Sequence, residues 1–102
     1  MKQYKIVSLK NLPQNTVKSF TVGNKRILIS NINGKIYAAD DLCTHSECSL
    51  GTDGFLDGRT IICGCHGSVF DVPSGKVKSL PATEDLNTYE TSVRDGFIYV
   101  RF

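Results

Sequence analysis

Short runs in which apolar and polar side chains alternate recur along this chain. A period of two residues is typical of β-strands with one buried face. In the final run, Ile98, Val100 and Phe102 would share such a face. No segment sustains the 3.6-residue period of an amphipathic helix, so the pattern predicts an all-β fold.

Two tight turns are predicted between neighbouring runs. Asn33-Gly34 separates "RILISNI" from "KIYAAD", and Asp95-Gly96 lies between "TYETSV" and "FIYVRF". Both dipeptides readily adopt the positive φ angles of β-hairpin turns. We therefore expect antiparallel sheets.

Residues 40–72 break this pattern, because they are rich in Gly, Asp, Ser and Cys and have no clear periodicity. Such a composition is typical of loops around a functional site. A chain of 102 residues suffices for one domain with one modest core. We expect that domain to consist of a base, residues 1–39 and 73–102, which carries an inserted tip at about residues 40–72.

Composition argues against nucleic-acid binding, a membrane span and secretion. The formal net charge of +2 is too small to indicate binding to nucleic acid. No apolar run approaches the roughly 18 residues that a membrane span needs, and "MKQYKIVSLKNL" lacks the apolar core of a signal peptide. We expect a cytoplasmic protein without a membrane span.

The charge is distributed unevenly along the chain. Residues 1–39 contain no acidic residue, whereas residues 40–72 contain six acids and a single base, Arg59. A solvated surface is the simpler interpretation, and a docking face for a basic partner is the alternative.

All four cysteines and both histidines fall in the expected tip, in "CTHSEC" at 43–48 and "CGCHGS" at 63–68. Cys43 with His45, and Cys63 with His66, form two clips that each offer one thiolate and one imidazole. A zinc ion would accept these four ligands in a tetrahedron. A 2Fe-2S cluster would place both thiolates on one iron and both imidazoles on the other. The spacing alone does not separate these two alternatives.

The other two cysteines, Cys48 and Cys65, stand outside that ligand set, and from the sequence they occupy matching places on the two clips. Cys65 directly precedes His66, which makes it a poor additional ligand for the same metal. A disulfide between Cys48 and Cys65 would tie the clips together and shield the site from water.

The segments "CTHSEC" and "CGCHGSVFD" resemble the two cluster-binding boxes of Rieske 2Fe-2S proteins. The resemblance covers nearly the whole chain and implies a Rieske fold, antiparallel sheets with a cluster-binding tip, that holds one 2Fe-2S cluster. It implies that Cys43 and Cys63 bind the inner iron and that His45 and His66 bind the outer iron.

The resemblance extends to the additional cysteine pair. Rieske subunits of cytochrome bc-type complexes typically carry this pair, whereas many oxygenase ferredoxins lack it. The resemblance therefore implies a Cys48–Cys65 disulfide.

Three neighbours of the ligands also match positions of that family. The hydroxyl of Ser68 is expected to donate to a bridging sulfide, and Phe70 stands where high-potential respiratory members have a tyrosine that donates to a cysteine sulfur. Pro81, in "SLPATEDL" with Leu80 and Ala82, matches a proline loop that covers the cluster.

These neighbours predict a reduction potential below that of the respiratory proteins. One hydrogen bond to a sulfur is missing at Phe70, and nearby negative charge disfavours an added electron. Histidine ligation still raises the potential above that of an all-cysteine ferredoxin. The acids expected to act in this way are Asp40, Asp41 and Glu47.

We expect an electron carrier and not an enzyme. Both histidines are committed to the cluster, so neither a 2-His-1-carboxylate iron site nor histidine acid–base chemistry is available. No glycine-rich nucleotide-binding turn is present. The expected protein is a monomeric one-electron carrier between a reductase and a terminal acceptor, with proton uptake at the histidine ligands.

Two alternatives stay open at this point. One is a subunit or soluble relative of a quinol-oxidising bc-type complex, which the cysteine pair favours and the missing membrane anchor opposes. The other is a structural zinc module that serves as an interaction domain.

Overall fold

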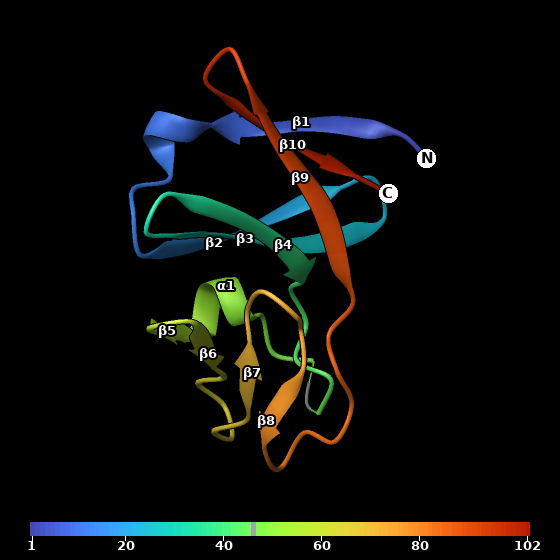
Figure 1. Ribbon diagram of the computed structural model, residues 1–102. Coiled ribbons are helices and arrows are strands. Elements are labelled where there is room, and N and C mark those ends of the chain that lie inside the picture. The colour runs from blue at the N-terminus through green and yellow to red at the C-terminus, as the bar shows by residue number, and fades with distance from the viewer. Residues whose placement is uncertain (46) are drawn as a thin grey trace.

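The computed structural model describes residues 1–45 and 47–102, which form antiparallel strands with little helix (Figure 1). The strands are β1 (Gln3–Ser8), β2 (Thr16–Val22), β3 (Lys25–Ile32), β4 (Lys35–Asp40), β5 (Phe55–Asp57), β6 (Thr60–Ile62), β7 (Val69–Asp71), β8 (Val77–Ser79), β9 (Thr88–Arg94) and β10 (Phe97–Arg101). The helical segments are the 3₁₀ turn η1 (Leu9–Asn11) and α1 (Leu50–Asp53). The prediction of an all-β fold is confirmed.

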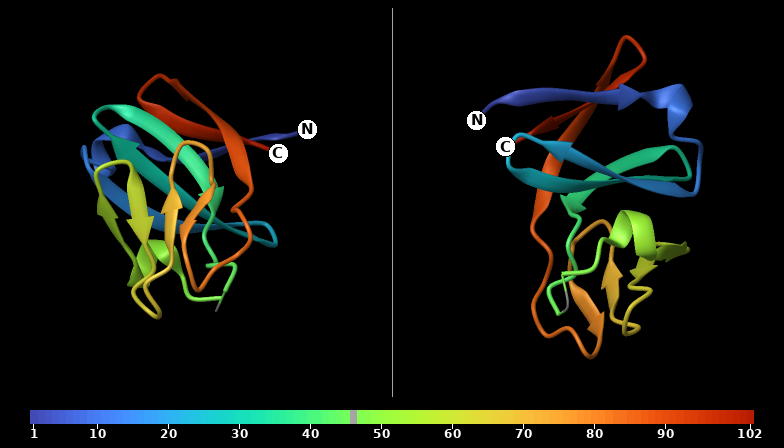
Figure 2. Two further views of the ribbon diagram at one scale, coloured as in Figure 1. Left: turned by 60° about the horizontal axis from the view of Figure 1, so that its bottom comes forward. Right: turned by 180° about the vertical axis from the view of Figure 1, so that it is seen from behind.

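Six strands form one sheet in the order β1-β10-β9-β4-β3-β2. This sheet is the base of the molecule, and it curls so that its edge strands β1 and β2 come into contact (Figure 2). The two predicted hairpins are confirmed: Asn33 and Gly34 have φ angles of 54° and 91°, and Asp95 and Gly96 have angles of 52° and 78°.

The inside of the curled sheet is an apolar core. The buried face predicted for the last strand is confirmed, since Ile98 and Val100 are fully buried and Phe102 packs against the same cluster. The other buried members of this base core are Leu12, Ile27, Ile29 and Ala38.

The other four strands form a small sheet in the order β5-β6-β7-β8, which lies at the opposite end of the molecule from β1 (Figure 1). Each of these strands has three residues. The expected end of the tip at about residue 72 falls inside this sheet, because β8 pairs with β7. We use the name tip for residues 41–87, which include this sheet and its loops.

A second apolar core joins the tip to the base. Leu28 and Ala39 reach it from the base, and Ile61 and Phe70 reach it from the tip. All four side chains are almost completely buried. The tip therefore packs on the outside of the curled sheet through a continuous apolar contact.

A buried carboxylate adds a polar connection beside this contact. Asp41 is fully buried and accepts hydrogen bonds from Ser19 Oγ at 2.9 Å, Ser49 Oγ at 2.6 Å and the Gly51 amide at 2.8 Å. Arg26 Nη2 lies 3.2 Å from the same carboxylate. Since Ser19 and Arg26 belong to base strands and the other two donors lie at the start of α1, Asp41 connects the tip to the base.

A membrane-spanning helix is not among the elements found over residues 1–45 and 47–102.

Candidate cluster-binding site

The first clip is a turn that follows β4. The Cys43 amide donates to the Cys48 carbonyl, and the Glu47 amide donates to the Cys43 carbonyl, both at 2.9 Å. Glu47 closes this turn with a positive φ angle of 56°. The backbone therefore holds Cys43 at the closed end of a five-residue loop.

The second clip, between β6 and β7, repeats this turn. The Cys63 amide donates to the Ser68 carbonyl at 2.8 Å, and the Gly67 amide donates to the Cys63 carbonyl at 3.0 Å. Gly67, in the position of Glu47, has a φ angle of 82°. The two clips are thus the same backbone turn with different side chains.

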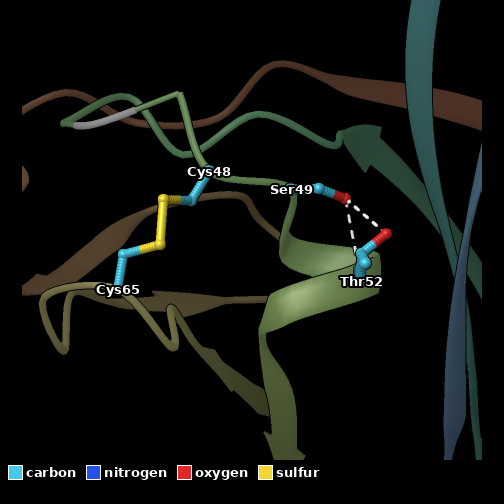
Figure 3. Close-up of a disulfide and its surroundings, with 4 residues drawn as sticks. All are labelled: Cys48, Ser49, Thr52 and Cys65. Atoms are coloured by element: carbon cyan, nitrogen blue, oxygen red, sulfur yellow. Dashed lines mark hydrogen bonds between the residues drawn. A yellow bond between two sulfur atoms is a disulfide. The ribbon is translucent and has the colours of Figure 1, made fainter.

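This shared turn corrects one expectation about the additional cysteines. When the two turns are aligned by their equivalent hydrogen bonds, Cys48 corresponds to Ser68 and Cys65 corresponds to His45. The two cysteines therefore do not occupy matching places. They are nevertheless joined by a disulfide with an S–S distance of 2.01 Å (Figure 3). The bond links the closing residue of the first clip to the middle of the second.

The four expected ligands divide clearly into buried sulfurs, which belong to the same apolar cluster, and exposed imidazoles. Cys43 and Cys63 are 1% and 2% exposed, whereas His45 and His66 are exposed. The two imidazole rings lie 5.2 Å apart between centroids and are almost perpendicular. Buried thiols and exposed imidazoles fit a Rieske-type cluster, whose inner iron takes sulfur ligands and whose outer iron takes nitrogen ligands.

A different set of sulfurs is also close together. The Sγ atoms of Cys48, Cys63 and Cys65 all lie within 4.8 Å of one another. Two of them belong to the disulfide and offer no thiolate, which is the form that binds a metal. The disulfide sulfurs are therefore not available as metal ligands, and Cys43, Cys63, His45 and His66 stay the predicted donor set.

The loop between β8 and β9 lies beside both clips (Figures 1 and 2). It contains Pro81, and the amide of Ala82 donates to Ser68 Oγ in the second clip at 2.9 Å. In the first clip, Thr44 Oγ1 donates to the carbonyl of Glu84 at 2.7 Å. The sequence does not predict this second hydrogen bond, because a side-chain bond to a backbone carbonyl 40 residues away leaves no local pattern.

Ser68 and Phe70 are both fully buried next to the site. Ser68 Oγ accepts the Ala82 amide, so its own O–H remains able to donate. Phe70 packs in the core that joins tip and base. Their expected effects on the cluster sulfurs stay predictions.

The three acids expected beside the site differ in their surroundings. Asp41 is paired with Arg26, which offsets its negative charge. Asp40 accepts hydrogen bonds from Asn87 Nδ2 at 3.0 Å and from the Tyr89 hydroxyl. Burial, and then the bond to Asp40, raise the pKa of Tyr89. Glu47 alone of the three acids is exposed.

Comparison with known proteins agrees with this geometry. A family model described as the Rieske [2Fe-2S] domain matches residues 2–90. The ferredoxin component of naphthalene 1,2-dioxygenase/salicylate 5-hydroxylase systems from Ralstonia sp. is 39% identical over 87 residues, which cover 85% of this chain and 83% of the relative. The biphenyl dioxygenase ferredoxin subunit of Pseudomonas sp. (strain KKS102) is 34% identical over 98 residues, or 96% of this chain and 90% of that protein.

Solved structures show the same fold. The ferredoxin of carbazole 1,9a-dioxygenase from Nocardioides aromaticivorans IC177 has a TM-score of 0.91 at 24% identity, over 98% of this chain and 97% of that one. A chain in a complex of reduced oxygenase and oxidized ferredoxin in carbazole 1,9a-dioxygenase has a TM-score of 0.89 at 32% identity, over 96% and 91%. The chain belongs to the Rieske [2Fe-2S] domain family, whose cofactor is one Rieske-type 2Fe-2S cluster.

Proposed function

We propose that this protein is a one-electron carrier that serves an oxygenase system. Cys43 and Cys63 would hold the inner iron of the cluster, and His45 and His66 would hold the outer iron. The observation that carries the proposal is the division of these side chains into buried thiols and exposed imidazoles. When bound, the cluster supplies reversible one-electron transfer.

The relatives support this role over an enzymatic one. The two relatives described above are named as ferredoxin components of dioxygenase systems. This chain has no histidine beyond the two proposed ligands. The electron would therefore pass to a terminal oxygenase, and a reductase would supply it.

The Cys48–Cys65 disulfide is the one feature that favours the second candidate, a relative of the quinol-oxidising bc-type complexes. The named ferredoxin relatives favour the first candidate. The two differ in expected potential, because bc-type members need a high potential to accept electrons from quinol.

The exposed rings of His45 and His66 also have a chemical consequence. An imidazole that binds a metal through one nitrogen can release the proton of its other nitrogen, and it does so more readily when the metal is oxidised. We propose that electron uptake at alkaline pH is accompanied by proton uptake at these rings, in a protein that acts as a monomer.

A potentiometric titration followed by low-temperature electron paramagnetic resonance tests the proposal. We expect a Rieske-type signal with a potential in the lower half of the roughly −150 to +300 mV range. The potential should fall at alkaline pH by up to about 59 mV per pH unit for each coupled proton. A potential that does not change with pH would argue against histidine ligation. Stoichiometric zinc without a reducible signal would refute the electron carrier.

Replacement of Ser68 tests the fine tuning of the potential. Ser68→Ala removes a hydroxyl that we expect to donate to a cluster sulfide, so the reduced state loses stabilisation. One hydrogen bond to a charged group contributes about 1.5–3 kcal/mol, which corresponds to a potential lower by about 60–130 mV. Ser79→Ala, on β8 and exposed, is the matched control and should leave the potential unchanged.

A further inference from the structure

Three cysteine sulfurs in the tip are arranged for a reaction that electron transfer does not use. The Sγ atoms of Cys48, Cys63 and Cys65 lie within 4.8 Å of one another, and two of them already form a disulfide. A thiolate next to a disulfide is the arrangement from which thiol–disulfide exchange begins. The bond and its surroundings are drawn in Figure 3.

We propose that Cys63 attacks the Cys48–Cys65 disulfide when the cluster is absent. The thiolate of Cys63 forms a new bond to Cys48 Sγ, the old bond breaks, and Cys65 leaves as a thiolate that takes up a proton from water. One disulfide is consumed and one is formed, so the step needs no oxidant or reductant. The inference rests on the proposed function in one respect, namely that cluster ligation is what keeps Cys63 from reacting.

The surroundings of the three sulfurs select Cys48 as the point of attack. Cys63 is buried, Cys48 packs against the same apolar core, and Cys65 is exposed. A leaving thiolate is stabilised by water, and Cys65 is the partner that water reaches. The new Cys48–Cys63 bond would lie at the core, and the exposed position would be left with a free thiol.

The alternative product, a Cys63–Cys65 bond, is disfavoured by the residue between them. Such a bond closes a ring across Gly64 alone, and short rings are stiff. A Cβ built on Gly64 would lie 1.8 Å from the Asp53 carbonyl oxygen, so the Gly64 backbone is packed against Asp53 on that side and cannot move toward it. Exchange should therefore go to Cys48.

This reaction would give the cluster-free protein a defined chemical state. Cys63 in a disulfide cannot bind iron, so the second clip loses its thiolate. Cys65 becomes an exposed thiol that electrophiles or small disulfides can modify. Reloading of the cluster would then require a small dithiol to reduce the Cys48–Cys63 bond.

The test compares the loaded full-length protein with the same protein after anaerobic removal of iron by a chelator. Free thiols are trapped with N-ethylmaleimide in mildly acidic denaturant, because exchange slows as thiolates are protonated. Digestion without reduction after Arg59 and Lys76 leaves Cys63 and Cys65 in one tryptic peptide. Fragmentation of that peptide at Gly64 by mass spectrometry then locates the label.

We expect at least tenfold more label on Cys65 in the chelated protein than in the loaded one, together with a Cys48–Cys63 crosslink. Labels on Cys43 and Cys63 with an unchanged Cys48–Cys65 bond in the chelated protein would overturn the inference.

Two cysteine variants provide matched controls. Cys63→Ser removes the attacking sulfur and should keep the Cys48–Cys65 bond, whereas Cys43→Ser should still exchange. Exchange in Cys63→Ser would refute Cys63 as the attacking group. Labelling of the loaded wild-type protein under native conditions, without denaturant, keeps the two hypotheses apart. Label on Cys63 while iron stays bound would refute its role as a ligand, whatever the disulfide does.

Discussion

The base and the tip are both built from antiparallel strands, but they are stabilised in different ways. The base strands have five to eight residues and pair over long registers, such as the seven residue pairs between β2 and β3. Every strand of the tip has three residues. Long strand pairs are stabilised by many backbone hydrogen bonds, whereas pairs of three-residue strands have few.

Individual side chains and close backbone contacts replace those hydrogen bonds in the tip. The Asp41 carboxylate connects the start of α1 to β2 and β3, the Cys48–Cys65 disulfide connects the two clips, and the Ser68–Ala82 hydrogen bond connects the second clip to the loop after β8. The comparison indicates that a single substitution can disable the tip, whereas an exposed substitution in the base should have little effect. The following variants test that contrast.

The largest effect is expected at Gly64 in the second clip. In Gly64→Ala the new Cβ would lie 1.8 Å from the Asp53 carbonyl oxygen, and that backbone oxygen cannot move aside as a flexible side chain could. We expect the clip to open and the purified variant to hold less than about a tenth of the wild-type iron, measured by metal analysis.

Gly58→Ala is the matched control for this substitution. Gly58 lies in the hairpin between β5 and β6 of the same sheet and has a positive φ angle of 61°, but its added Cβ would meet nothing within 4 Å. The left-handed backbone costs roughly 1–2 kcal/mol for alanine, and iron content should stay near that of the wild type. Equal iron loss in both variants would show that close packing at Gly64 is not the cause.

The next effect is expected at the buried carboxylate between the two regions. Asp41→Asn keeps the shape but leaves Arg26 without its ion pair and replaces an oxygen acceptor by a donor that faces two hydroxyls. We expect the free energy of unfolding, measured by guanidinium titration, to fall by about 2–4 kcal/mol, since Arg26 itself is partly exposed.

Glu90→Gln in the base is the control for Asp41→Asn. Glu90 pairs with Arg101 at 3.5 Å, and both side chains are more than half exposed. Exposed pairs contribute about 0–1 kcal/mol, so this change should be close to neutral. If the two substitutions destabilise the protein equally, the contrast between tip and base is wrong.

A third variant concerns the surface of the tip and not its stability. Leu80, in the loop between β8 and β9, is 74% exposed, whereas its neighbour Ala82 is buried and hydrogen-bonded to Ser68. An exposed apolar side chain in the loop that is hydrogen-bonded to both clips is suited to contact a redox partner. We expect Leu80→Ser to raise the KM for an oxygenase partner about tenfold without a change in potential.

Phe55→Ser supplies the comparison for this surface. Phe55 is 57% exposed on β5, which is the opposite edge strand of the small sheet from β8. Its replacement should leave the KM unchanged if docking occurs through the loops around the histidines. A larger effect of Phe55→Ser than of Leu80→Ser would place the docking surface on the other edge.

The sequence predicted local features of both regions well. The hairpin at Asn33-Gly34 is specified by two adjacent residues, and the two cysteine–histidine clips are specified by residue types that few other sites combine. The fold class followed from the strand and hairpin signals, and the cofactor followed from the resemblance of the two clips to the Rieske boxes.

Features that depend on distant residues were not predicted. Asp41 was counted as local negative charge near the site, because its donors Ser19 and Arg26 lie 22 and 15 residues away. The strand β8 was assigned to the base, because a run of three residues has no period to detect. The alignment of the two clips depends on backbone hydrogen bonds, which residue identities do not determine.

The smallest expected effect concerns Tyr89, which lies at the start of β9, the base strand that directly follows the tip. Burial, and then the hydrogen bond to Asp40, raise the pKa of Tyr89 above the ordinary value of about 10. Because the folded-state pKa is the higher one, the stabilisation is fully present below about pH 10 and is lost as the pH rises toward the folded-state value. Tyr89→Phe removes the bond, should cost about 1 kcal/mol at neutral pH, and should lessen the alkaline loss of stability.

Tyrosinate absorbance gives a direct measurement of this effect. The chain has four tyrosines. In the wild-type protein, one of them should ionise at a higher pH than the others, only as near-ultraviolet circular dichroism is lost. This late ionisation should be missing in Tyr89→Phe, whereas the exposed substitution Glu90→Gln should retain it. If a tyrosine that ionises only at the highest pH were still seen in Tyr89→Phe, the hydrogen bond to Asp40 would not be what delays ionisation of this hydroxyl. The start of β9 would then be held to the base by strand pairing alone.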